Sequence, residues 1–221
     1  YTKKVKKSKD FFLLSKGHAA LSLYVILYKK KFFSKKFLYK EFLSDGGKLG
    51  GHPDLNTSLG IDFSSGSLGH GLSIGCGIAL SKKKHKMPGN TYVLLGDGEC
   101  NEGMIWESIM FASNFKLNNL TAIIDYNNLQ GLDFSNKVID LSPLDEKLKS
   151  FGWEVYIVDG HDISELKKVF SIKNSKPKAV IAKTIKGKGI RSMENSISSH
   201  YETIDTKSKY EKLIKELNFI K

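Results

Sequence analysis

An aspartate flanked by two glycines is the first residue in the chain whose setting suggests chemistry. Asp97 follows an apolar segment predicted to be a strand, residues 91–95, and lies between Gly96 and Gly98. Glycines let the backbone approach a bulky anion and expose its N–H groups to that anion. An aspartate among phosphates serves mainly as a ligand for a hard cation such as Mg²⁺. Ordinary turns use the same residues, so the tripeptide needs a second group before it indicates a site.

That second group is an asparagine at the end of the next predicted strand. Asn127 lies thirty positions after Asp97, just beyond the apolar segment at residues 120–125. One strand–helix–strand unit spans this separation and brings the ends of both strands side by side. The amide oxygen of Asn127 and a nearby backbone carbonyl could then complete a set of oxygen ligands around a cation. The spacing therefore predicts a site for a divalent cation beside phosphates.

The remaining segments are those of an α/β protein that would position this site. Strands are predicted over residues 91–95, 120–125, 154–158 and 178–184. Helices are predicted over residues 17–30, 35–43, 68–84, 102–115, 144–151, 163–172 and 206–217. Buried apolar strands separated by helices predict a mostly parallel sheet with helices on both faces. No repeat or linker interrupts the pattern, so residues 1–221 are expected to form a single domain.

The loops at the carboxyl ends of the predicted strands are the expected ligand-binding region, because open parallel sheets bind ligands there. The loops that combine glycine with polar residues are 96–103, 126–131, 159–162 and 184–191. Asp97 and Asn127 both fall within them, which strengthens the prediction that the two side chains serve one site.

The helix predicted over residues 68–84 has an unusual composition, because it contains Gly69, Gly71, Gly75 and Gly77. Each interior glycine destabilises a helix by about 0.5–1 kcal/mol relative to alanine. A helix weakened in this way needs compensation from its surroundings. We therefore expect it to pack closely against another backbone or a ligand.

The composition of the 221 residues is that of an ordinary soluble globular chain, with 40% hydrophobic and 26% charged residues. It excludes a fibre, a disordered tail and a small disulfide-rich protein. No apolar run reaches the roughly 18 residues of a membrane-spanning helix, so no membrane partner is expected. The two cysteines, Cys76 and Cys100, are too few for a disulfide framework. They are expected to be free thiols in a reducing compartment, which indicates a cytoplasmic location.

The first ten residues carry no targeting signal of the secretory type. They are polar and lysine-rich, without the apolar core that such a signal needs. Because the chain begins with Tyr1 and not with methionine, we expect either that residues were removed or that the sequence is a fragment.

The chain is strongly basic. Its 35 lysines and arginines exceed its 23 aspartates and glutamates, which gives a net charge of +12. Arg191 is the only arginine, whereas nucleic-acid binding generally uses arginine to contact bases and phosphates. The lysines are scattered along the whole chain, which favours a lysine-rich surface and no nucleic-acid partner. An anionic partner or substrate is the alternative interpretation of this charge.

Several short segments together resemble the cofactor-binding amino-terminal domain of transketolases, especially of split transketolases whose halves are separate polypeptides. Gly-Asp-Gly followed thirty residues later by asparagine matches the thiamine diphosphate motif of these enzymes. The resemblance extends from about Phe11 to His200. The matching segments are Leu-Ser-Lys-Gly-His-Ala at 14–19, Gly-His-Pro at 51–53, Ser-Gly-Ser-Leu-Gly-His-Gly-Leu at 65–72, residues 96–107, and Lys-Thr-Ile-Lys-Gly-Lys-Gly at 183–189.

The resemblance implies binding roles for individual residues. The side chains of Asp97 and Asn127 and the backbone carbonyl of Leu129 would bind Mg²⁺. The residues that would contact thiamine diphosphate are His18, Ser67, Leu68, Gly96, Gly98, Glu99, Asn127 and His200. Among these, His18 could instead be an ordinary helix-capping residue.

The resemblance also implies catalytic candidates. His52 would lie near the substrate and the reactive carbon of the cofactor. His200 would lie near the diphosphate and the substrate, and it is followed by Tyr201 where the family has glycine. Glu102, with Glu107, resembles an acidic pair at a dimer interface that links two active sites. The alternatives are that His52 is an ordinary loop residue and that the two glutamates are first-turn carboxylates favoured by the helix dipole.

The activity that the resemblance implies is transfer of a two-carbon ketol unit from a ketose, or a ketose phosphate, to an aldose. The thiazolium carbon of the cofactor would add to the ketose carbonyl, and histidines suit proton transfer near neutral pH. In the family, a second domain binds the pyrimidine ring and supplies the glutamate that activates the cofactor. Too little chain remains here to build that domain.

The expected partners follow from that missing domain. We expect a carboxy-terminal transketolase subunit, self-association through the cofactor domain, and a heterotetramer with two copies of each chain. The expected small-molecule partner is a sugar or sugar phosphate.

Other functions remain open at this point. A 1-deoxyxylulose-5-phosphate synthase or the alpha subunit of a 2-oxo acid dehydrogenase shares the Gly-Asp-Gly and asparagine motif. Ser-Lys-Gly-His and Gly-His-Pro favour a transketolase, and a specialised biosynthetic pathway could use such a half-enzyme on an unusual sugar. A non-catalytic regulatory subunit or pseudoenzyme is the remaining alternative, and the presence of Asp97 and Asn127 argues against it.

Overall fold

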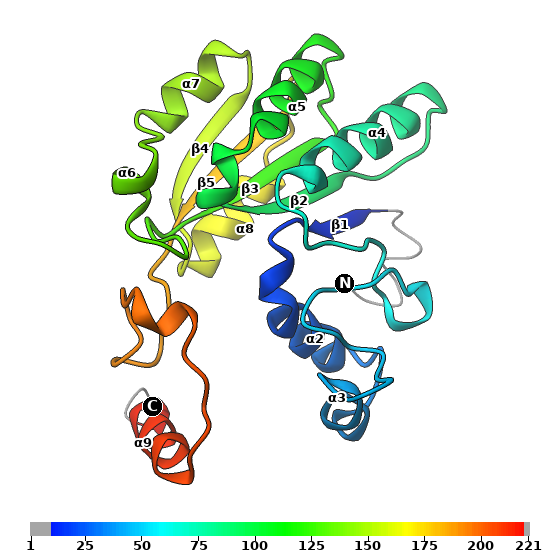
Figure 1. Ribbon diagram of the computed structural model, residues 1–221. Helices are drawn as coiled ribbons and strands as arrows, with labels where there is room; N and C mark the ends of the chain where they lie inside the picture. The colour runs from blue at the N-terminus through cyan, green and yellow to red at the C-terminus, as the bar shows by residue number, and fades with distance from the viewer. Residues whose placement is uncertain (1–9, 219–221) are drawn as a thin grey trace.

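Five parallel strands form the sheet of the computed structural model, which describes residues 10–218 (Figure 1). The strands are β1 (Phe11–Leu14), β2 (Thr91–Gly96), β3 (Leu120–Tyr126), β4 (Glu154–Asp159) and β5 (Lys178–Lys183). Their order across the sheet is β1-β2-β3-β5-β4, and all neighbouring pairs are parallel. The predicted parallel sheet is confirmed. β5 lies between β3 and β4 although it follows both in the chain.

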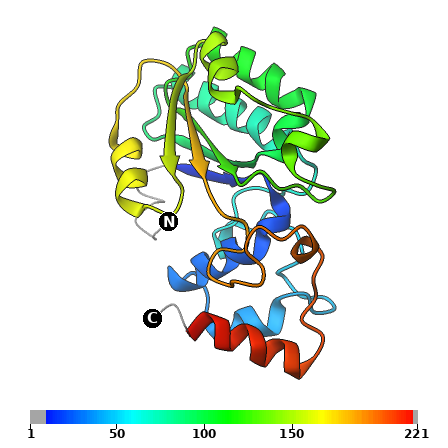
Figure 2. The ribbon, with the colours of Figure 1, turned by 90° about the vertical axis from the view of Figure 1, so that its left-hand side faces the viewer.

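Helices cover both faces of the sheet, as the sequence predicts. α4 (His70–Lys84), α5 (Gly103–Asn114) and α7 (Leu144–Ser150) lie on one face, and α8 (Ile163–Ser171) lies on the other (Figure 2). Beyond the carboxyl ends of the strands lie α2 (Ala20–Lys29), α3 (Lys35–Glu41) and α9 (Lys207–Asn218). The shorter helical turns are α6 (Ser135–Val138), η1 (Gly17–Ala19), η2 (Thr57–Leu59), η3 (Gly98–Asn101) and η4 (Ser198–His200).

β1 is the strand that the sequence pattern does not reveal. It has only four residues, too few for an apolar run to be distinguished from the start of a helix. Leu13 and Leu14 are buried, and the whole strand pairs in register with the first part of β2. Because the two strands are parallel, β1 delivers residues 15–18 to the same edge of the sheet as Asp97.

Two helices begin later than their sequence patterns predict. The helix expected from residue 17 opens with the tighter turn η1, and the regular helix α2 starts at Ala20. The helix expected from residue 68 starts at His70, because Gly69 has a φ of +85°, a left-handed conformation that an α-helix does not accommodate.

Close packing of α4 on the sheet accounts for the glycines of this helix. A Cβ atom on Gly71 would collide with the Ser15 side chain, and one on Gly75 would lie 2.5 Å from Cγ2 of Val93. The two glycines therefore let the helix lie directly on β1 and β2, as expected from the sequence. A Cβ atom on Gly77 would instead meet no atom within 4 Å.

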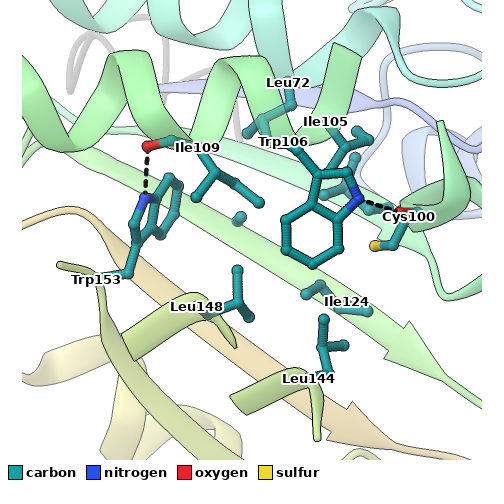
Figure 3. Close-up of a pocket in the computed structure, with 11 residues that line it drawn as sticks. Leu72, Cys100, Ile105, Trp106, Ile109, Ile124, Leu144, Leu148 and Trp153 are labelled. Atoms are coloured by element: carbon teal, nitrogen blue, oxygen red, sulfur yellow. Dashed lines mark hydrogen bonds between the residues drawn. The ribbon is translucent and has the colours of Figure 1, made fainter. Parts of the chain in front are cut away.

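The main core lies between the sheet and the helices α4, α5 and α7. Two tryptophan side chains face this layer and satisfy their indole N–H groups on backbone carbonyls (Figure 3). Trp153 Nε1 donates to Ile109 O at 3.0 Å, and Trp106 Nε1 donates to Cys100 O at 2.9 Å. The void between them measures about 10 Å³, room for roughly one water molecule. This region is therefore packing core and not a ligand site.

Both cysteines are buried free thiols, in agreement with the sequence analysis. Burial raises the pKa of Cys76 to about 12. Burial, with the nearby Glu99 and Asp97 carboxylates, also raises the pKa of Cys100. Neither thiol is therefore a thiolate nucleophile at neutral pH. Within residues 10–218, the helices lack the length and apolar character needed to cross a membrane.

Alanine substitutions at two glycines of α4 should have opposite effects on stability. Gly75→Ala forces a methyl group against the buried, stiff side chain of Val93 and should lower the free energy of unfolding by about 1–3 kcal/mol. Gly77→Ala adds a methyl group in open space and should raise the free energy of unfolding by about 0.5–1 kcal/mol, since the unfolded chain loses freedom. Urea unfolding of both variants measures this; equal effects would contradict the packing described here.

Candidate functional site

A cleft of about 500 Å³ lies at the carboxyl ends of the strands, where the sequence predicts ligand binding. The predicted site residues that line it are His18, His52, Leu68, Gly96, Asp97, Gly98, Glu99, Glu102, Asn127, Leu129 and His200. Ser67 and Glu107 do not line the cleft, and both are exposed. The structure thus brings together residues from loops far apart in the chain.

Asp97 is held at the end of β2 by donors from two loops. It is 2% exposed. Gly98 N donates to Oδ1 at 2.8 Å, while Asn128 N and Ser135 Oγ donate to Oδ2 at 2.6 and 3.0 Å. Burial raises the pKa of this carboxyl group, and the three hydrogen bonds oppose that rise. The loop after β3 therefore wraps around Asp97, so that the two strand ends form one structural unit.

Asn127 lies at the end of β3 with its side chain turned into its own loop. It is 9% exposed, and its Oδ1 accepts a hydrogen bond from Leu129 N at 3.0 Å. An amide oxygen has a second lone pair, so this bond leaves acceptor capacity. No cluster of three or more His, Cys, Asp or Glu side chains within residues 10–218 could hold a metal ion by itself. A cation at this site would therefore need amide, carbonyl or ligand oxygens beside the Asp97 carboxylate.

Glu99 is a buried carboxylate that joins three segments of the cleft. It is 2% exposed. Its side chain accepts hydrogen bonds from Ser15 Oγ, from Gly69 N at 2.9 Å and from Gly96 N at 3.1 Å. These donors follow β1, precede α4 and end β2, respectively. Although Glu99 lines the cleft, its carboxylate is occupied by the fold and holds neighbouring loops in place.

His52 lies in a loop whose backbone carbonyls are within hydrogen-bond distance of a buried tyrosine hydroxyl. Tyr24 is fully buried, and its hydroxyl lies 3.1 Å from Gly50 O and 3.2 Å from His52 O, either of which can accept its proton. The imidazole ring stands over Gly66, where a Cβ atom would come within 3.4 Å of it. The backbone on both sides of His52 therefore determines where its ring enters the cleft.

A lysine and an aspartate connect three strand ends behind the cleft. Lys16 Nζ lies 2.5 Å from Oδ2 of Asp125, and Thr184 Oγ1 donates to the other oxygen of the same carboxylate. Burial disfavours the charged form of Asp125, but the Lys16 charge and the hydrogen bonds hold its pKa below the usual range. The residues after β1, near the end of β3 and after β5 are thereby connected by one ionised carboxylate.

Positively charged groups gather on the cleft lining. The pKa of His18 is lowered to about 4 by partial burial, by Lys16, and by His200, Lys186 and His52. Burial also lowers the pKa of Lys186 and of His200, and the neighbouring lysines lower both further. These shifts share one cause, because groups of like charge in a partly desolvated cleft disfavour one another. Such a cleft favours an anionic ligand.

Unpaired polar atoms at the cleft fit a polar ligand of this kind. Asn101 Oδ1 and Gln130 Nε2 are buried and have no hydrogen-bond partner within the described part of the chain. Buried polar atoms are costly when unpaired. Gly98 lies under the Gln130 side chain, where a Cβ atom would be 2.8 Å from Cγ. The donor set, the carboxylate of Asp97 and the surrounding cations therefore suit a phosphate-bearing ligand with a divalent cation.

Glu102 and Glu107 lie at the start and on the exposed side of α5. Glu102 caps the helix and lines the cleft beside Gly69, where a Cβ atom would lie 2.9 Å from the Glu102 Cβ. Exposed apolar side chains surround this region: Ile74 on α4, and Met110 and Phe111 on α5.

Several cleft residues have no role in the sequence analysis. They are Lys16, Gly66, Asn101, Gln130, Gly131, Val138, Ile139, Lys186 and Tyr201. The sequence could have indicated a role for Lys16 and Lys186, because each closely follows a strand end within a segment that resembles the family. It could not have done so for Gln130 and Tyr201, since their positions depend on how two long loops meet.

A comparison with protein families finds a match over residues 3–215 to the family described as the transketolase, thiamine diphosphate binding domain. Among curated relatives, the chain is 38% identical over 214 residues to a subunit of the apulose-4-phosphate transketolase of Phocaeicola vulgatus, with 95% of this chain and 75% of that protein aligned. It is 37% identical over 197 residues to the 6-deoxy-6-sulfo-D-fructose transketolase subunit SqwG of a Clostridium species, covering 87% and 70%.

Full-length transketolases are similar over only part of their length. The human transketolase is 40% identical over 211 residues, which are 94% of this chain and 33% of that protein. Among solved structures, the transketolase of Campylobacter jejuni superposes with a TM-score of 0.85 at 28% identity, covering 96% of this chain and 34% of that one. The chain thus spans about a third of these longer proteins and most of the separate subunits.

Replacing His18 with asparagine should change how stability depends on pH. The pKa of His18 is about 4 in the folded chain and 6.5 without perturbation, so the unfolded state binds more protons between these values. The free energy of unfolding therefore falls as the pH drops through this window. His18→Asn lacks this contribution and should lose less stability than the unmodified chain. Urea unfolding at pH values of about 7, 5.5 and 4.5 measures the difference, and His85→Asn is the surface control. If the free energies of unfolding of His18→Asn and the unmodified chain differ by the same amount at every pH, the lowered pKa of His18 is contradicted.

Proposed function

This chain belongs to the transketolase family, as its thiamine diphosphate-binding domain, and from that premise we propose that it is the amino-terminal subunit of a split transketolase. Its reaction is transfer of a two-carbon ketol unit from a ketose to an aldose. One observation carries the proposal: the buried Asp97 and Asn127 end adjacent strands inside a cleft whose lining also holds two lysines and three histidines. Residues 1–221 act as one cofactor-binding domain.

The cofactor in this proposal is thiamine diphosphate with Mg²⁺. Asp97 and Asn127 would bind the cation by their side chains and Leu129 by its carbonyl oxygen. Gly98 and the imidazole of His18 would contact the diphosphate, and Leu68 would contact the aminopyrimidine. When bound, the cofactor supplies the nucleophilic carbon and accepts the negative charge left on the transferred fragment.

The protein contributes position, charge and protons. Lys16 and Lys186 line the cleft and would offset the charge of the diphosphate together with the cation. His52 would exchange a proton with a substrate hydroxyl through an imidazole nitrogen, because its loop is fixed by Tyr24 while its ring faces the cleft. An uncharged His18 would orient the ligand by a hydrogen bond without adding repulsion between cations.

A carboxy-terminal partner completes the enzyme in this proposal. The relatives that match over most of their length carry names of transketolase subunits, and this chain covers about a third of a full-length transketolase. Self-association would use α5, where Glu102 and Glu107 lie beside the exposed Met110 and Phe111. Two copies of each chain would form a heterotetramer.

The proposed substrate class is an anionic sugar handled in the cytoplasm. The substrates in the names of the two separate-subunit relatives are one phosphorylated and one sulfonated sugar. The net charge of +12 and the cleft lysines suit such a ligand. The free buried thiols agree with a reducing compartment.

Cofactor binding should require both the partner and Asp97. We expect calorimetric titration of thiamine diphosphate with Mg²⁺ to detect binding to the complex co-expressed with the adjacent carboxy-terminal half, and much weaker binding to this chain alone. Asp97→Asn keeps the shape of the side chain but removes its charge, so it should weaken binding by at least an order of magnitude. Mass measurement of the complex tests the heterotetramer.

Asp159→Ala is the matched control for that titration, because Asp159 is an exposed carboxylate at the end of a different strand, β4. It should bind like the unmodified complex. Absence of cofactor binding with and without the partner would contradict the proposed function and favour a non-catalytic subunit.

His52→Ala should separate catalysis from cofactor binding. Removing the imidazole should lower the turnover of ketol transfer by roughly 10²–10⁴-fold, the range of general acid–base catalysis. The affinity for thiamine diphosphate should stay measurable, since the predicted cation ligands are intact. Turnover is followed with the partner present, and His85→Ala supplies a surface control. Unchanged turnover in His52→Ala would remove His52 from the mechanism.

A further inference from the structure

Two residues of the cleft form a hydrogen bond whose direction follows from the charge of the lysine. Lys186 Nζ lies 2.7 Å from His200 Nδ1. A lysine ammonium group has three donors and no acceptor, so Nδ1 must accept and cannot carry a proton. The imidazole is then uncharged, with its one proton on Nε2. We propose that Lys186 is a positioning residue that holds His200 as the neutral Nε2–H tautomer, with Nε2 as a hydrogen-bond donor to the ligand of the cleft.

The loop between these two residues is built to bring them together. Lys186 follows β5, and His200 comes fourteen residues later. Asn195 N donates to Lys186 O at 3.0 Å and closes the base of the intervening loop. Gly187 has a φ of +77°, and a Cβ atom there would collide with the backbone carbonyl of Met193. The turn after Lys186 therefore requires glycine, and this turn returns the chain to the cleft.

The Nε2 side of the His200 ring faces the wall of the cleft. A Cβ atom on Gly131 would lie 3.5 Å from Nε2 and 2.5 Å from the Tyr201 hydroxyl. The Tyr201 ring packs edge-on against His200, with centroids 4.6 Å apart and an angle of 68°. The His18 ring lies on another side, 6.1 Å away between centroids. Lys186 thus holds Nδ1, while Nε2 lies near Gly131 in the cleft lining, where the Tyr201 hydroxyl is the neighbouring side-chain group.

The charges around His200 agree with an uncharged ring. The titratable groups that face it are Lys186 and Lys16, the imidazole of His18 and the phenol of Tyr201. Burial, then Lys186 and Lys16, lower the pKa of His200 from its ordinary 6.5. Burial and then Lys16 lower the pKa of Lys186, and the carboxylates of Asp125 and Asp97 oppose part of that lowering. A protonated His200 would place a third cation beside two lysines, whereas the neutral ring adds a donor without adding charge.

The proposal rests on the proposed function only for the identity of the acceptor, an oxygen of the substrate or of the diphosphate. The state of His200 is a property of this chain and is measured on it directly. The probe is long-range ¹H–¹⁵N spectroscopy of the full chain labelled at histidine, which distinguishes the two neutral tautomers and the charged ring. Loss of one signal in His200→Gln assigns the residue.

The variants separate charge from hydrogen bonding. Lys186→Met removes both, so His200 should become a mixture of tautomers and its pKa should rise toward 6.5. Lys186→Gln removes the charge and offers both a donor and an acceptor, so the pKa of His200 should rise and the Nδ1–H tautomer should gain population. Lys186→Arg keeps both and should resemble the unmodified chain. Lys188→Met is the matched control, because Lys188 lies in the same loop with its side chain 51% exposed, and it should change nothing.

Ketol-transfer activity of the complex with the partner is the second test of the proposal. Lys186→Met should lower kcat by about 10–100-fold, the range seen when groups that orient functional histidines are removed, and should shift the acid limb of the pH profile upward. Lys186→Arg should restore most of the loss. An inactive unmodified complex would refute the proposed function and leave the spectra to decide the state of His200.

An unchanged tautomer and pKa in Lys186→Met, or an Nδ1–H tautomer in the unmodified chain, would overturn the proposal. So would a changed tautomer with unchanged kcat. A thermal melt of each variant shows whether it folds; if Lys186→Met unfolds, the comparison of Lys186→Gln with Lys186→Arg decides the same question.

Discussion

Two adjacent buried carboxylates hold the cleft together. Each is nearly inaccessible to water, and each takes its donors from segments distant in the chain. Burying a carboxylate is unfavourable unless hydrogen bonds replace its hydration, and charge-assisted bonds are the stronger kind. Glu99 therefore requires the ends of β1 and β2 and the start of α4 to meet at one point. Asp97 likewise requires the end of β2 and the loop after β3 to lie together. These two requirements constrain the shape of the cleft.

The charges of the cleft complement this scaffold. Burial and nearby basic side chains together lower the pKa values of His18, Lys186 and His200. The scaffold thus holds together groups of like charge that water would otherwise separate. The histidines avoid this repulsion by remaining uncharged, so the lysines supply the positive charge that attracts an anionic ligand. The cleft is in this sense organised for its ligand before the ligand arrives.

Much of this arrangement is predictable from the sequence, and the rest has physical reasons for escaping prediction. Asp97 and Asn127 could be placed side by side because a single strand–helix–strand unit separates them. β1 was not predicted because four residues show no usable periodicity, and the position of Lys16 in the cleft lining was missed for the same reason. The resemblance implies that Glu99 contacts the cofactor, but the structural role of its carboxylate follows only from donors that meet in three dimensions. The pairing of Lys186 with His200 depends on the closure of an irregular loop, which no local pattern encodes.

The strand order also determines when this cleft can exist. A chain emerging from the ribosome completes β4 before β5, yet β4 pairs only with β5 in the sheet. β4 therefore has no strand to join until β5 is made and enters between it and β3. Thr184 and Lys186 follow the end of β5. β1 pairs with β2, which lies eighty residues later in the chain. Completion of the cleft therefore comes late in synthesis, because Lys186, His200 and Tyr201 all follow β5 in the chain.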